Sequence, residues 1–138
     1  MYRAVDQHGQ VIDVYVSVRR NTAAAARFFR SAIGSQGEPV EVTTDRAWAL
    51  ARVIDELLPA ARHDTSQYAN NRVEADHGRL KARLRPMRGL KRTRTASVVI
   101  VGHAFIQNLR RGHYELGTHA ATDHLRLAAA FEELAATI

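Results

Sequence analysis

The chain has 138 residues, which is the length of one domain with a single hydrophobic core. It contains no cysteine, so a disulfide framework and a thiolate zinc site are both excluded. Its longest aliphatic run, Val98 to Val101, is far shorter than the roughly 20 apolar residues of a membrane span, and no signal peptide opens the sequence. We therefore expect a soluble, cytoplasmic protein.

The net charge of +6 is concentrated in one part of the chain. Residues 1–66 carry eight basic and eight acidic side chains, residues 67–115 carry eleven and three, and residues 116–138 carry one and three. The net charges of the three parts are therefore 0, +8 and −2. A local excess of this size predicts a surface for a polyanion such as nucleic acid.

The first part of the chain has the pattern of a hairpin followed by a helix. A strand-like run at residues 2–6, a turn at residues 7–10 and alternating apolar residues from Ile12 to Val18 predict a hairpin with one buried face. Asn21 is placed to cap a helix, and Gly34 is placed to end it.

The next elements are a strand and a second helix. Val40 and Val42 begin a predicted strand that ends in Thr43-Thr44-Asp45, and apolar residues at helical spacing follow from Ala47 up to Pro59. A weak strand is expected over residues 61–65. Residues 95–112 have helical period although Val98 to Val101 locally favours a strand, and a last amphipathic helix is marked by Leu127, Phe131, Leu134 and Ile138.

The stretch from Gln67 to Arg94 predicts a helix that begins near an acidic residue. Asn71 followed by Glu74 has the spacing of a capping box, in which the Asn accepts from the first-turn amides and the Glu reaches back. At about 100° per residue, one stripe of this helix packs and the neighbouring stripe faces a cleft. The packing stripe is Val73, His77, Leu80 and Leu84, and the cleft stripe is Glu74, Gly78, Lys81 and Arg85. Glu74 is either a capping residue alone or a catalytic carboxylate held at a helix start.

A basic track follows Glu74 along the same stretch, with no acidic residue inside it. We expect it to bind DNA, although a solvated surface helix would also explain a basic run. The track consists of Arg79, Lys81, Arg83, Arg85, Arg88, Lys91, Arg92 and Arg94.

The histidines form none of the standard zinc-ligand pairs, so we expect no zinc site. Asp76 and His77 resemble an acid–base pair, but adjacent helical residues point about 100° apart. We therefore expect them to support the region around Glu74 rather than to react.

Three blocks in this order resemble the catalytic core of bacterial insertion-sequence DDE transposases of family six, within the retroviral-integrase-like superfamily. The blocks are YRAVDQHGQVIDVYVS, TTDRAWA and YANNRVEADHGRLKARLRPMRGLK, and the resemblance covers residues 2 to about 116. The third block is the most specific, because it carries N-N-x-V-E-x-D-H-G-x-L-K followed by a G-L-K loop.

The resemblance implies a ribonuclease-H-like fold in which three carboxylates hold two divalent metal ions, Mg²⁺ or Mn²⁺, that align a water or a DNA 3′-hydroxyl against a phosphodiester. By motif, Asp45 is the second of these carboxylates and Glu74 is the third. Both are hard oxygen ligands of the kind that Mg²⁺ prefers. Lys81 lies on the Glu74 stripe and could contact a phosphate.

The sequence also departs from the family pattern. The family's first carboxylate lies in an Asp-Glu-Thr strand ahead of the first block, whereas this sequence opens at Met1-Tyr2. Asp6 and Asp13 match non-catalytic positions of the family and are poor substitutes. Trp48 and Leu50 also differ from the family's residues beside Asp45.

We therefore expect a ribonuclease-H-like mixed sheet flanked by helices that lacks its first, central strand. Residues 1–116 are expected to form this incomplete core, and residues 117–138 a linker and C-terminal helix. The leading hypothesis is a shortened transposase domain that descends from an enzyme of DNA cleavage and strand transfer and is inactive alone. The alternatives are a DNA-binding or regulatory partner of a full-length transposase and a decayed mobile-element fragment. The expected assembly is a homo-oligomer or a complex with a full-length transposase.

Overall fold

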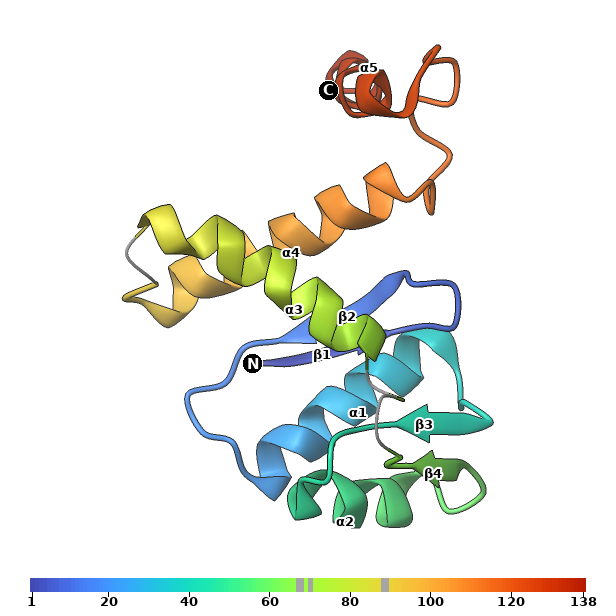
Figure 1. Ribbon diagram of the computed structural model, residues 1–138, viewed down its shortest axis with the longest axis vertical. Coiled ribbons are helices and arrows are strands. Elements are labelled where there is room, and N and C mark those ends of the chain that lie inside the picture. Colours follow the sequence, from blue (N-terminus) through green and yellow to red (C-terminus); the bar gives the residue numbers. More distant parts are fainter. Residues whose placement is uncertain (67–68, 70, 88–89) are drawn as a thin grey trace.

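The computed structural model describes residues 1–66, 69, 71–87 and 90–138, and it shows a mixed α/β fold (Figure 1). Its elements follow in the order β1 (Tyr2–Val5), β2 (Val11–Tyr15), α1 (Thr22–Gln36), β3 (Glu41–Thr43), α2 (Trp48–Leu57), β4 (Arg62–Asp64), α3 (Asn71–Leu84), the 3₁₀ helix η1 (Arg85–Met87), α4 (Thr93–Arg110) and α5 (Asp123–Ala136).

The N-terminal strands β1 and β2 form the expected antiparallel hairpin, with Tyr2 opposite Tyr15. Its turn is closed by Asp6, whose Oδ1 accepts from the backbone N–H groups of His8 and Gln10, both at 2.8 Å. Gly9 supplies the positive φ of 86° that this turn requires. The second strand is shorter than predicted, because it ends at Tyr15 and leaves Val18 85% exposed.

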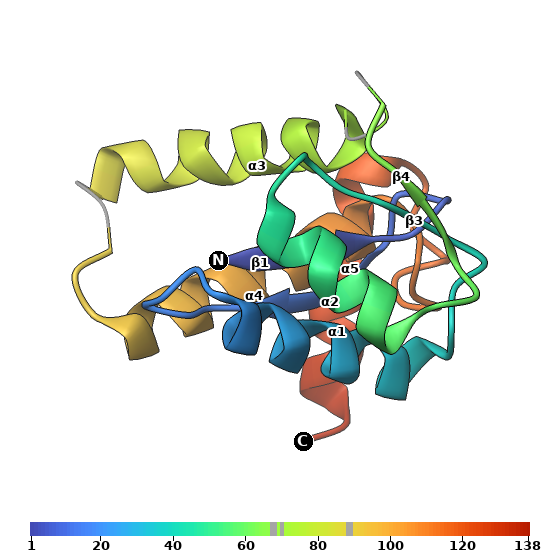
Figure 2. The same ribbon diagram turned by 90° about the horizontal axis from the view of Figure 1, so that it is seen from below.

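Helices cover both faces of the hairpin, so the prediction of one buried face is wrong. On one face, the ring of Tyr2 stacks on Phe28 of α1 with their centroids 5.6 Å apart. Arg3, the next residue, is also buried, and it reaches α3 on the other face. Figures 1 and 2 show α1 on one side of the hairpin and α3 with α4 on the other.

Asn21 caps α1 as predicted, since its side chain accepts from the backbone N–H of Ala24 at 3.0 Å. The prediction that Gly34 ends this helix is wrong. The helix continues to Gln36, and Gly37 ends it with a φ of 84° while its N–H donates to the carbonyl of Ile33. Only the second glycine lies where a left-handed residue is needed.

The strands β3 and β4 form a parallel pair, with Glu41 opposite Arg62. Helix α2 leads from one to the other, and its buried Val53 and Ile54 join the core cluster that contains Phe28. The described part of the chain therefore contains two separate two-stranded sheets, β1-β2 and β3-β4, rather than one continuous sheet.

Residues 93–110 form helix α4, as the helical period predicted against the local strand preference of Val98 to Val101. Ile100, Ala104 and Gln107 are buried on one side of it, and Leu109 is buried on the opposite side. Near its end, the side-chain amide of buried Asn108 bonds both backbone groups of Val11: its Oδ1 accepts from the N–H at 2.7 Å and its Nδ2 donates to the carbonyl at 2.8 Å. None of the described helices is both long and apolar enough to span a membrane.

The last helix, α5, lies at the far end of α4 (Figure 1). The preceding loop is fixed to it, because the guanidinium of Arg126 donates to the carbonyls of Tyr114 and Leu116, and Glu133 accepts from the N–H of Gly117. The predicted apolar stripe is only partly covered, because Leu127 and Leu134 are half-buried and its other two members are exposed. Phe131 is 48% exposed and Ile138 is fully exposed, whereas Ala129 and Ala130 are buried.

Candidate functional site

Asp45 lies in the short loop between β3 and α2, and its side chain is exposed. Its Oδ1 accepts from the backbone N–H of Ala47 at 3.2 Å, as is typical of an aspartate that precedes a helix. The loop is held by Thr44, whose hydroxyl donates to the Asp45 carbonyl and is joined to His63 Nε2 at 2.7 Å. This hydrogen bond ties the Asp45 loop to β4.

Glu74 lies in the first turn of α3 and is also exposed. The helix begins at Asn71, which is therefore its first residue rather than the predicted cap, and the preceding position 70 lies outside the described residues. Glu74 and His77 lie three residues apart on α3, and the charge of Glu74 acts to raise the pKa of that imidazole. Burial of His77 outweighs this effect and lowers the pKa below its ordinary value.

Asp76, two residues after Glu74, is fully buried between two arginines. Its Oδ2 lies 2.5 Å from Nε of Arg3 on β1, and its Oδ1 accepts from Nη2 of Arg111, just after α4, at 2.7 Å. The Arg3 contact has the length of an ion pair without the angle of a hydrogen bond, since neither atom has a hydrogen-bond partner among the described residues. Asp76 thereby joins the hairpin, α3 and the end of α4.

Burial dominates the electrostatics of this cluster. Desolvation lowers the pKa of Arg3, and the charge of Asp76 only partly opposes it. Breaking such a buried pair leaves an uncompensated charge, which makes the pair a strong positional constraint. It therefore fixes the helix that carries Glu74.

The sequence prediction missed Arg3 and Arg111 as members of this site. A signal was present for their partner, because Asp76 is three residues after Val73 and four before Leu80 and therefore lies on the packing side of the helix. A carboxylate on a packing side needs a buried cation. Nothing local in the sequence indicates which arginines supply it.

Burial confirms the packing stripe predicted for α3, whereas the neighbouring stripe is exposed and none of its residues lines the pocket between α3 and α4. Leu80 is 3% exposed, and Val73, His77 and Leu84 are half-buried, whereas Glu74, Gly78, Lys81 and Arg85 are exposed. The basic track is likewise solvent-accessible at each position that the structure describes. These positions are Arg79, Lys81, Arg83, Arg85, Lys91, Arg92 and Arg94, while Arg88 lies outside the described residues.

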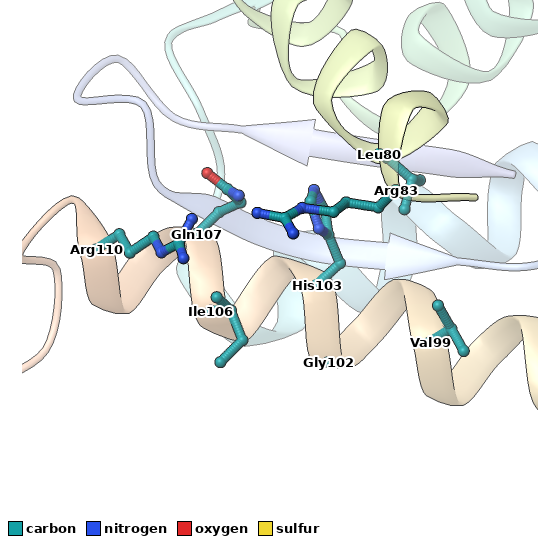
Figure 3. A pocket seen from close by; sticks show the side chains of 8 residues that line it. All are labelled: Leu80, Arg83, Val99, Gly102, His103, Ile106, Gln107 and Arg110. Carbon is teal, nitrogen blue, oxygen red and sulfur yellow. The ribbon is translucent and has the colours of Figure 1, made fainter. Parts of the chain in front are cut away.

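A pocket of about 250 Å³ lies between α3 and α4, beside this track (Figure 3). It was not foreseen from the sequence. Its lining residues are Leu80, Arg83, Val99, Gly102, His103, Ile106, Gln107 and Arg110.

The described residues contain no group of three His, Asp or Glu side chains close enough to hold a metal ion. Asp6 and Asp13, the poor substitutes for the family's first carboxylate, both have other hydrogen-bond partners. Asp6 accepts hydrogen bonds in the hairpin turn, and Asp13 Oδ1 accepts from the N–H of Val14. Asp45 and Glu74 are both exposed carboxylates, on the β3–α2 loop and in the first turn of α3.

Comparisons with known proteins agree with the resemblance seen in the sequence. The sequence profile of a family described as a DDE domain matches residues 1–113. The chain is 36% identical over 88 residues to a transposase for the insertion sequence-like element IS431mec of Staphylococcus aureus, and equally to a transposase for insertion sequence element IS257 in transposon Tn4003 of the same species. The matched region is 60% of this chain and 39% of each relative, so the chain spans well under half of their length. No solved structure gives a significant match.

Proposed function

We propose that the chain, which belongs to the DDE domain family of insertion-sequence transposases, forms part of a catalytic core for DNA cleavage and strand transfer. The observation that carries this proposal is the family match over residues 1–113, which includes both Asp45 and Glu74. DNA is the proposed substrate, and a homo-oligomer or a full-length transposase is the proposed partner.

The fold we propose is ribonuclease-H-like without its central strand. Three features support it: β1 and β2 form an antiparallel pair, β3 and β4 form a parallel pair, and the two pairs are not joined to each other within the described residues. A strand added between β1 and β3 would make one mixed sheet of the two.

We propose that Asp45 and Glu74 hold a divalent ion, Mg²⁺ or Mn²⁺. Metal ions bound in such a site stabilise the attacking and leaving oxygens of a phosphodiester. The other residues act by position: the Thr44–His63 hydrogen bond holds the Asp45 loop, the Arg3–Asp76–Arg111 cluster holds α3, and Lys81 contacts a phosphate near Glu74.

Mn²⁺ binding to the 138-residue chain tests this assignment without requiring activity. Followed by electron paramagnetic resonance, the chain should bind one Mn²⁺ weakly, because Asp45 and Glu74 are the only two carboxylates placed by motif. Asp45→Asn and Glu74→Gln should each abolish binding. The control is Asp55→Asn, which removes an exposed carboxylate of α2 and should bind Mn²⁺ as the unmodified chain does. Binding that survives both site substitutions would show that the metal lies elsewhere.

A second candidate function is DNA binding without chemistry, and the exposed cations of α3 and the following loop favour it. If about six of them reach phosphates, the slope of log affinity against log salt should be near −5. Charge reversal of Lys81, Arg85 and Arg88 should flatten that slope. DNA binding that is indifferent to salt and to these substitutions would exclude the basic track as the interface.

A further inference from the structure

The pocket between α3 and α4 is lined by cationic, amide and apolar side chains, and no acidic residue is among those that the structure places around it (Figure 3). Its volume of about 250 Å³ is below the roughly 300–1,000 Å³ of sites that enclose a whole small molecule. It therefore fits one charged group of a larger ligand.

The polar side chains of the pocket converge from the two helices. Figure 3 shows Arg83 reaching from α3 toward Gln107 and His103 of α4, with Arg110 beside Gln107. Leu80, Val99 and Ile106 form apolar walls around them. Two guanidinium groups that face one space without a carboxylate repel each other, and an anion between them removes that repulsion.

Arginines that do not line the pocket also act on its residue His103. Burial is the largest cause that lowers the pKa of His103, and the charge of Arg3 is the second largest. The charges of Arg83 and Arg111 also lower this pKa, whereas the charge of Asp76 raises it. His103 Nε2 is buried and has no hydrogen-bond partner among the described residues. The pocket thus combines excess positive charge with a polar atom that lacks a partner.

We propose that this pocket binds a phosphodiester group of DNA, held by Arg83 and Arg110, with Gln107 donating its amide N–H and the adjacent deoxyribose lying on the apolar walls. The inference rests on the proposed function and makes it more specific. It adds Arg110 and Gln107, which lie outside the basic track, and it replaces diffuse attraction along α3 with a defined anchoring point. Guanidinium groups suit this role because they can pair two phosphate oxygens at once. A polyanion is favoured as the ligand because residues 67–115 carry a net charge of +8.

Salt-dependent binding of duplex DNA to the full chain separates the pocket residues from the rest. Arg110→Gln should reduce the slope of log affinity against log salt by about 0.9, the value for one phosphate contact. Gln107→Leu should weaken binding and leave the slope unchanged, because it removes a neutral donor. The matched control is Arg30→Gln, which removes an exposed cation of α1. An Arg110→Gln variant that behaves like Arg30→Gln overturns the proposal.

A second measurement uses inorganic phosphate as the probe and is independent of DNA. In a histidine titration by NMR, phosphate should raise the pKa of His103 relative to chloride at equal ionic strength, because a bound anion favours the imidazolium. His8, exposed in the hairpin turn, should not respond, and Arg110→Gln should remove the response of His103.

The two measurements distinguish this inference from the proposed function. A chain that binds no DNA overturns the proposed function, while a phosphate response at His103 still supports a phosphate site in the pocket. A chain that binds DNA but shows neither the Arg110 effect nor a response at His103 overturns the pocket alone. Displacement of phosphate by an acidic peptide but not by DNA would assign the pocket to a protein partner and overturn the inference.

Discussion

At the scale of single residues, the candidate site combines exposed carboxylates with a buried one. Asp45 and Glu74 are exposed, whereas Asp76 is buried and engaged by Arg3 and Arg111. The motif in the sequence identified Asp45 and Glu74 as candidates, because their neighbours match the family pattern. The two arginines could not be identified in this way, since Arg3 and Arg111 reach Asp76 from elements remote in the chain.

We predict that Asp76→Asn lowers the free energy of unfolding by about 3–5 kcal/mol, because it leaves the buried guanidinium of Arg3 without a counter-charge. Urea unfolding followed by circular dichroism measures this. Asp55→Asn removes an exposed carboxylate and should change stability by no more than about 0.5 kcal/mol. Equal stabilities of the two variants would mean that the Asp76 cluster does not hold α3.

At the scale of elements, helix and strand identities could be predicted from the sequence better than their ends. Helix α4 formed despite four consecutive β-branched residues, because its 3.6-residue period places Ile100, Ala104 and Gln107 on a buried side. The end of α1 was misplaced because a glycine can lie inside a helix or beyond it. Gly37, not Gly34, adopts the positive φ.

The same distinction gives a prediction for two alanine substitutions. Gly34→Ala should raise the free energy of unfolding by about 0.5–1 kcal/mol, because Gly34 is helical and its added Cβ would meet no described atom within 4 Å. Gly117→Ala should loosen α5, because Gly117 has a φ of 62° and its Cβ would lie 2.4 Å from the carbonyl oxygen of Arg126. Hydrogen exchange should show faster exchange of the α5 amides in Gly117→Ala only. Unchanged exchange there would contradict the packing of this loop on α5.

At the scale of the whole molecule, the described residues form two small sheets, where a complete ribonuclease-H-like fold has one continuous sheet. Local pattern predicted the hairpin and the strands β3 and β4, but it could not show that β3 pairs with β4 or how the two pairs relate, because that depends on hydrogen bonds between strands distant in sequence. A two-stranded sheet is marginal alone and needs packing or more strands. Here α1 packs against both the hairpin and α2, through Tyr2, Phe28 and Ile54.

The proposed fold predicts a gain of activity on extension. The 138-residue chain should not join transposon-end DNA, because its motif positions supply two carboxylates for a reaction that the family performs with three. A version extended at its N-terminus by a strand bearing the family's first aspartate should show Mg²⁺-dependent strand transfer in a gel assay. Asp45→Ala or Glu74→Ala should abolish that activity, and Asp55→Ala should not. Strand transfer by the unextended chain would instead direct attention to Asp6 or Asp13.

The bond pair between Asn108 and Val11 decides on which side the hairpin can accept another strand. The primary amide of Asn108 has the same donor and acceptor as a peptide group, and it occupies both backbone groups of Val11. At this position the side chain of Asn108 makes the hydrogen bonds that a neighbouring strand would make, so no strand can pair with β2 there. The start of β2 is therefore blocked against pairing with a further strand at Val11, and we expect an added strand to pair along β1 instead.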